Sequence, residues 1–409
     1  MSYDKLSKVF YKKGNPFYEQ EIEKRKSSYG SYLTELEING FRKGKVVNDT
    51  YSLFYVNTHV LMNLNNQVLL NSSKISSLIN KLPRFVIEPY FLKLIVNEAQ
   101  SNNEIEGIRS TRKELKDVLQ DVMKSKKNSK RFKGMMKTYL FIDEIQSFND
   151  VADFRNLYDE LVSDEVDKDD KPDGEMFRKD YVEINDGTKT THTGVNSEAK
   201  IIESLDALIH FLEDENHPEL YRYMVAHYYY EYIHPFYDGN GRTGRLLVCS
   251  YLSRYLERYS AITFSYAVNN NKSKYYKALE EVPNPFNQGE TTFFLIDMLE
   301  LLLEGQQSII EELEMNLAKT QQIKAFFKES RWENQQEAKN VLRVMLHLNV
   351  FVSDSEPLSM PQLMELTNQS RYKTNQVMAY LEKEAFVEIV SQRPKKYRVA
   401  DEFLENILL

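Results

Sequence analysis

The stretch HPFYDGNGRTGR, residues 234–245, decides how the middle of this chain folds. Before it, LYRYMVAHYYYEYI reads as a helix, and Pro235 prevents that helix from continuing past His234. The glycines of DGNG make a helix costly at that point and allow the backbone to turn sharply. After them, RTGRLLVCSYLSRYLERYS resumes the spacing of apolar residues that is typical of a helix. The sequence therefore predicts two helices joined by a glycine-rich loop.

The predicted loop has the composition of a polyphosphate site. Its glycines let backbone N–H groups converge at the start of the second helix, where the helix dipole favours an anion. Arg242 and Arg245 lie three residues apart, so both guanidinium groups project from one face of that helix. Asp238 supplies a hard oxygen ligand suited to Mg²⁺. His234 can accept a proton from a hydroxyl group, so the stretch predicts both a phosphate cradle and a base.

Two aromatic residues in the stretch have no role in this chemistry. We expect Phe236 to anchor the loop in the core and Tyr237 to lie at its rim. A tight turn between helices with surface arginines would explain the glycines and the proline. It would not explain a histidine, an aspartate, an asparagine and two arginines at one place, so the functional interpretation is favoured.

The composition is that of an ordinary globular protein and restricts the kinds of function. Of 409 residues, 42% are hydrophobic and 28% are charged. The net charge of −8 argues against a broad nucleic-acid-binding surface. The single cysteine, Cys249, excludes an intramolecular disulfide and a Cys-based zinc site, and it fits a reducing compartment. Because no signal pattern and no membrane-length apolar stretch is found, we expect a cytoplasmic protein with no membrane partner.

The expected fold class is mainly α, in three regions. Residues 1–84 are expected to form an N-terminal helical region, and residues 85–330 a helical core that holds the loop. In residues 335–409, three helical segments and two short strands around QRPKK form the outline of a winged helix-turn-helix. Its mild basic character comes from Arg371, Lys373, Arg393, Lys395 and Lys396. Contact with DNA and contact with a protein both remain open for this region.

The motif in residues 234–245 resembles that of the Fic family, HPFx[D/E]GNGRxxR, and every fixed position is present. The resemblance implies a helical core and transfer of AMP from ATP, with Mg²⁺, to a Ser, Thr or Tyr hydroxyl of a target protein, with the chain itself as a further acceptor. By motif position, His234 would deprotonate that hydroxyl and Asp238 would bind Mg²⁺. The phosphates would be held by Gly239, Asn240, Gly241, Arg242, Gly244 and Arg245, the last at the γ-phosphate. Transfer of phosphocholine or UMP also occurs in the family and stays open.

A short β-hairpin is predicted at about residues 178–195. FRKDYVEI and TKTTHTGV flank Asp186-Gly187, a dipeptide favoured in two-residue hairpin turns. An isolated hairpin needs a partner surface to be stable, so it is a candidate for contact with substrate. By resemblance it matches the family's flap, which aligns the target segment as an added strand. We expect His192, within it, to be incidental to the catalysis.

Glu106 is the candidate inhibitory residue. SNNEIEGIRST, residues 101–111, ends a helix at Gly107, which alone indicates a glycine cap with a solvated glutamate before it. By resemblance, residues of about 86–107 form the family's inhibitory helix, in which Glu106 pairs with Arg245 and denies it to the γ-phosphate. The family's Ser or Thr position is occupied here by Asn102, which can still form hydrogen bonds.

Downstream of the second predicted helix, three residues resemble the adenine-side residues of relatives. They are Tyr275, Tyr276 and Asn287. The tyrosines are equally consistent with ordinary core packing. Two alternative functions remain open beside AMP transfer. One is a winged-helix, DNA-binding regulator whose Fic core senses nucleotide, and the other is an enzyme that also removes AMP, with Glu106 orienting water. A homodimer is an expected possibility.

Overall fold

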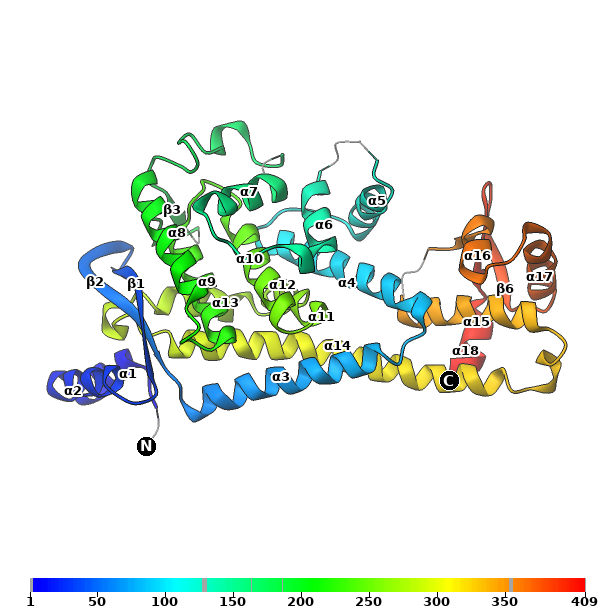
Figure 1. The fold of residues 1–409 in the computed structure, drawn as a ribbon, viewed down its shortest axis with the longest axis horizontal. Coiled ribbons are helices and arrows are strands. Elements are labelled where there is room, and N and C mark those ends of the chain that lie inside the picture. Colours follow the sequence, from blue (N-terminus) through cyan, green and yellow to red (C-terminus); the bar gives the residue numbers. More distant parts are fainter. Residues whose placement is uncertain (1–2, 127–130, 163, 186, 353–355, 409) are drawn as a thin grey trace. The chain divides into compact units, whose positions relative to one another are not determined.

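The computed structural model describes residues 3–126, 131–162, 164–185, 187–352 and 356–408 (Figure 1). The chain divides into two compact units, residues 1–73 with 94–307 and residues 74–93 with 308–409. The fold is mainly helical with small antiparallel sheets, as predicted. The units do not follow the predicted boundaries at 84/85 and 330/335, because the helices α3 (His59–Ile79), α4 (Arg84–Ile105) and α14 (Thr292–Phe326) each have residues in both units.

Helix α10 (Asn240–Tyr255) is the centre of the first unit. All its residues from Asn240 to Ser253 are buried, and it contacts α7, α9, α11 and α12. The other helices described in this unit are α1 (Leu6–Lys13), α2 (Asn15–Lys26), α5 (Arg112–Met123), α6 (Lys133–Leu140), α7 (Val151–Leu161), α8 (Glu198–Glu213), α9 (Glu219–Ile233), α11 (Arg258–Ala261), α12 (Phe264–Asn270) and α13 (Lys272–Glu281), with 3-10 turns at Ile142–Glu144, Lys168–Asp170 and Pro285–Asn287. Such complete burial fixes the glycine loop that precedes α10.

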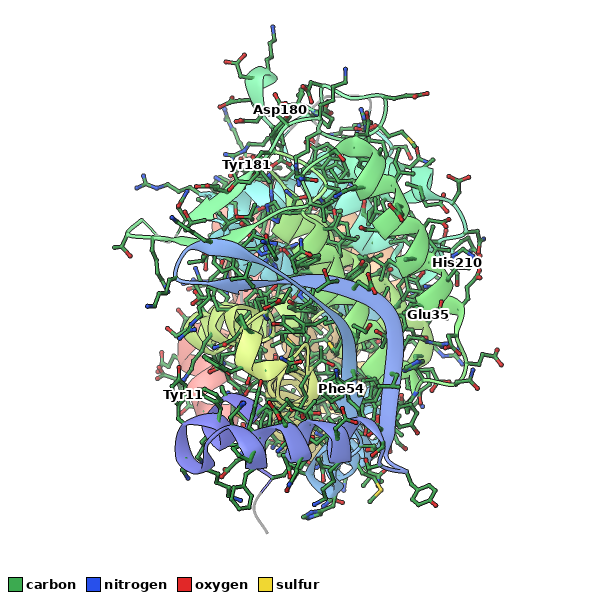
Figure 2. All side chains as sticks on the ribbon, turned by 90° about the vertical axis from the view of Figure 1, so that its left-hand side faces the viewer. Tyr11, Glu35, Phe54, Asp180, Tyr181 and His210 are labelled. Carbon is green, nitrogen blue, oxygen red and sulfur yellow. The ribbon has the colours of Figure 1, made fainter. Side chains whose placement is uncertain are left out.

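Two long strands correct the prediction that residues 1–84 are helical. β1 (Ser31–Arg42) and β2 (Lys45–Val56) form an antiparallel hairpin whose turn has positive φ angles at Lys43 and Gly44. Along β1, Leu36 and Ile38 are buried while Glu35, Glu37 and Asn39 are exposed, the alternation that one covered sheet face requires. Figure 2 shows this hairpin crossing one face of the unit, with Phe54 and Glu35 labelled on it.

The short hairpin predicted at 178–195 is present, with smaller strands. β3 (Glu183–Asn185) pairs with β4 (Thr190–Thr193) in an antiparallel register that joins Ile184 to His192. The predicted turn residue Asp186 lies outside the described residues, while Gly187 has φ 88°. Strand β2 contacts β4, so the long hairpin supplies part of the partner surface that the short one needs.

The second unit contains the elements predicted for residues 335–409. These are α15 (Gln336–Phe351), β5 (Leu358–Ser359), α16 (Met360–Thr367), α17 (Arg371–Lys383), β6 (Val387–Gln392) and β7 (Lys395–Val399), followed by α18 (Asp401–Leu408) and preceded by a 3-10 turn at Ser330–Trp332. The strands form one sheet in the order β5-β7-β6. Three of the predicted basic residues pair with carboxylates, in the pairs Lys373–Glu337, Lys395–Glu382 and Lys396–Glu356.

No helix within the described part of the chain is both long and apolar enough to span a membrane.

Candidate functional site

The predicted loop joins α9 to α10 and is held rigidly. α9 ends at Ile233, its cap residue His234 has φ 53° and ψ 62°, and Gly239 before α10 has φ 82°. Phe236 is fully buried and stacks on Tyr158 with ring centroids 3.7 Å apart, which confirms its predicted role as an anchor. The side chain of Asn240 bonds Phe236 twice, accepting from its N–H at 2.9 Å and donating to its carbonyl at 2.7 Å. Asn240 therefore shapes the loop from inside.

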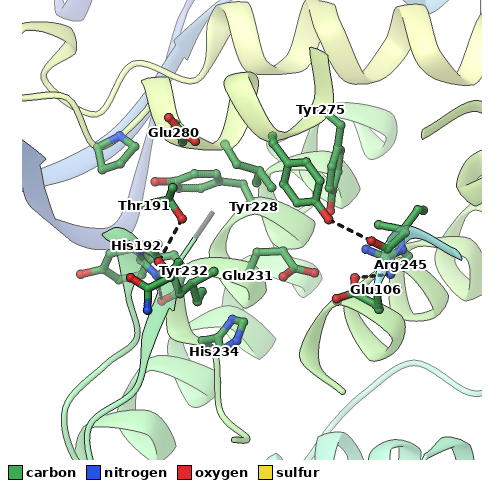
Figure 3. Close-up of a pocket in the computed structure, with 17 residues that line it drawn as sticks. Glu106, Thr191, His192, Tyr228, Glu231, Tyr232, His234, Arg245, Tyr275 and Glu280 are labelled. Atoms are coloured by element: carbon green, nitrogen blue, oxygen red, sulfur yellow. Dashed lines mark hydrogen bonds and ion pairs between the residues drawn. The ribbon is translucent and has the colours of Figure 1, made fainter. Parts of the chain in front are cut away.

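A cavity of about 560 Å³ opens beside this loop (Figure 3). This volume is in the range of small-molecule sites. His234, Gly241 and Arg245 line it from the motif, and Glu106 lines it from the end of α4. The remaining lining residues are Ile105, Ile184, Asn185, Thr191, His192, Tyr228, Glu231, Tyr232, Tyr275, Tyr276, Leu279, Glu280 and Pro283. The structure thus brings the predicted base, one predicted arginine and the predicted inhibitory glutamate to one cavity.

Arg245 is held by the end of α4. Its Nη2 donates to Glu106 Oε1 at 2.6 Å, and its Nε donates to Asn102 Oδ1 at 2.7 Å. Burial alone would lower the pKa of Arg245, but the Glu106 carboxylate and its neighbours outweigh burial and raise it. A Cβ at Gly241 would lie 2.2 Å from Glu106 Oε1, so glycine is required for this approach. The predicted Glu106–Arg245 contact is present, and Asn102 serves it as a hydrogen-bond acceptor.

The glycine cap predicted at Gly107 is also present, and it explains the position of Glu106. Gly107 has φ 71°, the N–H of Ile108 donates to the Asn103 carbonyl at 2.9 Å, and the N–H of Gly107 donates to that of Glu104 at 3.3 Å. These two backbone hydrogen bonds are typical of a helix that ends in a left-handed turn. The cap places Glu106 at the last position before the turn, from which its side chain reaches Arg245.

Arg242 is paired away from the cavity. Its Nη1 donates to Glu165 Oε2 at 2.8 Å, and both side chains are almost completely buried. Burial raises the pKa of Glu165, and the Arg242 charge opposes that rise. Glu165 also accepts from the N–H of Phe132 at 3.1 Å. The structure does not bring Arg242 to the cavity wall, and sequence reasoning missed Glu165, which is distant in sequence and carries no motif.

His234 is held as a neutral imidazole. Burial lowers its pKa to about 3, the electrostatic effects of His192 and Arg178 lower it further, and a hydrogen bond with the Glu231 backbone opposes them. The ring therefore carries no charge near neutral pH and can accept a proton. His192 also lines the cavity, and its Nε2 lies 2.7 Å from the carbonyl oxygen of Tyr232. Burial lowers the pKa of His192 to about 4.

Glu231 is a cavity residue that the motif did not indicate. It lies one helical turn before His234, and Figure 3 shows it between His234 and the Arg245–Glu106 pair. Burial raises its pKa to about 8, Arg245 opposes this, and Glu106 adds to it. A Cβ at Gly244 would lie 2.3 Å from Glu231 Oε1, which explains that glycine. A glutamate at helical spacing from the histidine was the only signal for it.

Of the three predicted adenine-side residues, two line the cavity and one does not. Tyr275 and Tyr276 line the cavity, and Tyr276 OH donates to the Ile105 carbonyl at 3.4 Å. Asn287 is not among the lining residues. It is buried, accepts from the N–H of Ser7 at 3.0 Å and donates to the Glu281 carbonyl at 2.7 Å. The Asn287 side chain therefore attaches the first helix of the chain instead of reaching a ligand.

The residues present fit a bound nucleotide with a cation. Asp238 is exposed at the loop, and its Oδ1 accepts from the Gly239 N–H at 2.6 Å, which leaves the other oxygen for a cation. Among the residues that the structure describes, no three His, Cys, Asp or Glu side chains gather as a metal site. A single carboxylate, with phosphate oxygens and water as the other ligands, is the usual arrangement for Mg²⁺. The rim tyrosine Tyr237 donates to Asp173 at 3.0 Å and steadies the loop.

Comparisons with known proteins find one family match and several structures of similar fold. Residues 148–252 match the model of the Fic/DOC family. The structure is similar to that of a Fic family protein from Desulfovibrio desulfuricans G20, with 17% identity, a TM-score of 0.53, and coverage of 88% of this chain and 99% of that chain. A likeness at this identity concerns the fold.

Two further solved structures are similar to parts of the chain. A Fic-domain-containing signaling protein from Bacteroides thetaiotaomicron has 19% identity, a TM-score of 0.41, and coverage of 61% of this chain and 95% of that chain. A fragment of Fic-1 from C. elegans has 17% identity, a TM-score of 0.41, and coverage of 62% and 74%.

Proposed function

We propose that this chain is a protein adenylyltransferase restrained by its own Glu106, a proposal supported by the match of residues 148–252 to the Fic/DOC family model. It would transfer AMP from ATP to a hydroxyl group of a target protein. The observation that carries the proposal is that His234 and Arg245 line one cavity, with Arg245 bonded to Glu106 at 2.6 Å. A base and a phosphate-binding cation are what transfer of a nucleotide to a hydroxyl requires.

The proposed reaction uses His234 as the base. The neutral imidazole accepts the proton of the acceptor hydroxyl, whose oxygen forms a bond to the α-phosphorus of ATP. The bond between that phosphorus and the oxygen bridging to the β-phosphate breaks, and pyrophosphate leaves. Asp238 and the phosphates would hold Mg²⁺, which offsets the negative charge that develops on them. The backbone amides at the start of α10 and Arg245 would orient the phosphates.

Restraint would follow from competition for one guanidinium group. Arg245 is buried and its Nη2 already serves Glu106, so a γ-phosphate at the same position must displace that carboxylate. The exposed fraction of the Glu106 side chain is 31%, so the carboxylate can leave towards solvent. ATP bound before that departure would have its phosphates displaced from the geometry for transfer.

The β3–β4 hairpin is the proposed contact for the target. Ile184 and Thr191 line the cavity from the two strands, and Tyr181 beside β3 is exposed. A target segment in extended conformation could add to the edge of this hairpin through main-chain hydrogen bonds. Its hydroxyl side chain would then face the cavity that His234 lines.

For residues 335–409 we propose a winged helix-turn-helix that docks a protein. The order α15, α16, α17 and a sheet of β5, β6 and β7 supports that fold. Lysines on α17 and β7 are already paired with carboxylates, which lowers the positive charge available to DNA phosphates.

The first test is the intact mass of the full chain after incubation with ATP and Mg²⁺. Four proteins are compared: the wild type, Glu106→Gly, Glu106→Gly with His234→Ala, and Glu104→Gly. Glu104, near the end of the same helix, binds Asn269 instead of Arg245, so its variant controls for a loosened helix end. We expect added AMP only in Glu106→Gly.

Other outcomes separate the alternatives. Equal modification of Glu106→Gly and its His234→Ala partner would exclude His234 as the base. Tight ATP binding without modification of any variant or of candidate targets would favour the nucleotide-sensing regulator. Loss of added AMP from a modified protein, dependent on Glu106, would show the second activity of removing AMP.

A further inference from the structure

Arg178 is a completely buried arginine that joins the loop to the hairpin. It lies before β3, and within the described residues every hydrogen bond of its guanidinium goes to a backbone carbonyl. Nε bonds the carbonyl of His234 at 2.8 Å, and Nη1 bonds that of Asp180 at 2.6 Å. Nη2 bonds those of Val195 at 2.7 Å and Ile233 at 3.3 Å. One side chain therefore contacts both ends of the hairpin segment and the end of α9.

A buried charge without a counter-ion is costly unless fixed dipoles replace it. Within the described chain, no carboxylate forms an ion pair with Arg178. The carbonyls of Ile233 and His234 stand at the carboxyl end of α9, where the helix dipole favours a cation. Burial lowers the pKa of Arg178 to about 10, so the side chain still carries its charge at neutral pH. The backbone carbonyls around Arg178 therefore form a buried site that stabilises its positive charge.

The surrounding backbone is shaped for this guanidinium. A Cβ at Gly194 would lie 2.4 Å from Arg178 Nη2 and 3.1 Å from the Cβ of His234, so only glycine leaves room. His234 itself has φ 53°, a conformation that a residue with a side chain rarely adopts. The N–H of Val195 also donates to the Ile233 carbonyl at 3.1 Å. The end of α9 and the end of the hairpin segment are therefore bonded to each other beside Arg178.

We propose that Arg178 is a positioning residue that keeps the proposed base and the proposed target-aligning hairpin in one fixed geometry. Transfer needs the acceptor hydroxyl within reach of the imidazole, and the two come from separate segments. By bonding the His234 carbonyl and both ends of the hairpin segment, Arg178 sets the distance between them. This inference rests on the proposed transferase function for its catalytic consequence, while the coupling itself does not depend on it.

Arg178 also acts on the base through its charge. It is one of the groups that lower the pKa values of His234 and His192, after burial. Removal of the charge would therefore raise the pKa of His234 and shift the acid limb of a rate profile upward. A residue that only filled space would not move that limb.

The test uses the full chain in the Glu106→Gly background with Arg178→Met and Arg178→Lys. Arg155→Met is the matched control, because Arg155 donates to the Met176 carbonyl at 2.7 Å in the same segment but contacts neither His234 nor the hairpin ends. Three properties are measured: the rate of self-modification with ATP and Mg²⁺, ATP affinity by calorimetry, and hydrogen exchange of residues 180–195.

We expect transfer to fall about 100-fold in Arg178→Met and about tenfold in Arg178→Lys, whose ammonium cannot serve both segments. ATP affinity should stay within about twofold of the parent, since Arg178 does not line the cavity. Exchange should quicken in residues 180–195 and in His234, but not elsewhere. Arg155→Met should match the parent in all three properties.

Full transfer in both variants, or unchanged exchange of the hairpin, would overturn the inference. So would a loss of ATP affinity in proportion to the loss of transfer, because that describes a generally damaged domain. If the Glu106→Gly parent itself transfers no AMP, the proposed function fails, and exchange of the hairpin in Arg178→Lys decides the coupling alone.

Discussion

Arg242 and Arg245 lie three residues apart on the same helix, and each forms an ion pair with one glutamate. The two glutamates differ in how far they are exposed to solvent. Glu165, the partner of Arg242, is 6% exposed, whereas Glu106, the partner of Arg245, is 31% exposed. Glu165 also binds a backbone N–H of the neighbouring loop. Glu106 directly follows Ile105, the last residue of α4, and lines the cavity.

The difference separates a pair that maintains the fold from one that can act as a switch. A fully enclosed pair cannot lose one partner without leaving a buried charge. A partly exposed carboxylate can move into solvent at small cost. Two arginines on the same helix thus have different roles. The exposure of the glutamate that each arginine pairs with decides whether the pair maintains the fold or can act as a switch.

The largest expected effect is on stability at Glu165. Glu165→Gln should lower the free energy of unfolding by roughly 3 kcal/mol, because Arg242 then keeps its charge without a counter-ion. Glu106→Gln should cost less than about 1 kcal/mol, since Arg245 keeps its contacts with Asn102. Urea unfolding of the two variants measures both. Equal losses would show that the two pairs do not differ in kind.

The second effect is on nucleotide affinity. Glu106→Gly should bind ATP about tenfold more tightly than the wild type, because Arg245 no longer has to be released. In Glu165→Gln, at a temperature where it is folded, affinity should not rise, since Arg242 does not line the cavity. Calorimetry with ATP and Mg²⁺ gives both values. A gain in Glu165→Gln as large as in Glu106→Gly would contradict the assignment of the switch to Glu106.

A third effect concerns Glu231, the cavity acid whose pKa is influenced by the charge of Arg245. Its pKa is raised from 4.5 to about 8 in the folded chain, so the folded chain binds the extra proton and its stability falls as pH rises through that range. The lowered pKa of His234 acts in the opposite sense but only below 6.5. Between pH 6.5 and 8 the wild type should therefore lose stability that Glu231→Gln retains, on the order of 1 kcal/mol.

Thermal unfolding of the two proteins across that window, in matched buffers, measures the difference. Parallel stability curves would mean that Glu231 ionises normally and that its burial has no consequence for the charge around Arg245.

The smallest effect is expected at Asn102. Asn102→Ser should weaken the restraint by less than about 1 kcal/mol, since a hydroxyl can replace the amide oxygen that accepts from Arg245 but cannot also serve Tyr139. The rate of self-modification should rise by less than about fivefold over the wild type. A rise as large as that of Glu106→Gly would make Asn102, and not Glu106, the main restraint.

The loop was predictable because its chemistry is local, whereas the Glu106–Arg245 contact joins residues 139 positions apart and was predicted only through the resemblance to a family motif. His234, Asp238 and Arg245 lie within one short stretch, residues 234–245, and Pro235 and Gly239 dictate where the helices end and begin. The α4 cap at Gly107 likewise depends on one residue. Glu165 and Arg178 were not predictable, because each acts on a residue more than fifty positions away and a lone charged residue in a polar segment normally indicates solvent exposure.

The N-terminal strands were predictable in principle. Leu36 and Ile38 alternate with glutamates, Lys43-Gly44 is suited to a tight turn, and TYSLFYV is rich in strand-forming residues. The prevailing helical pattern of the chain outweighed this signal. The interpretation of Asn287 failed for a different reason. Its partner lies at the start of the chain, and a polar residue after the site helix does not show which element will cover it.

The long β1–β2 hairpin and the helices before it have a consequence for the order of assembly during synthesis. The Phe41 N–H donates to the carbonyl of Pro283, a cavity residue, and Arg25 pairs with Glu290 across 265 positions of sequence. At about 5–20 residues per second, the ribosome delivers those partners roughly 15–50 s after the segment they bind. One wall of the cavity is therefore completed late, so a growing chain has no finished cavity until most of it has been made.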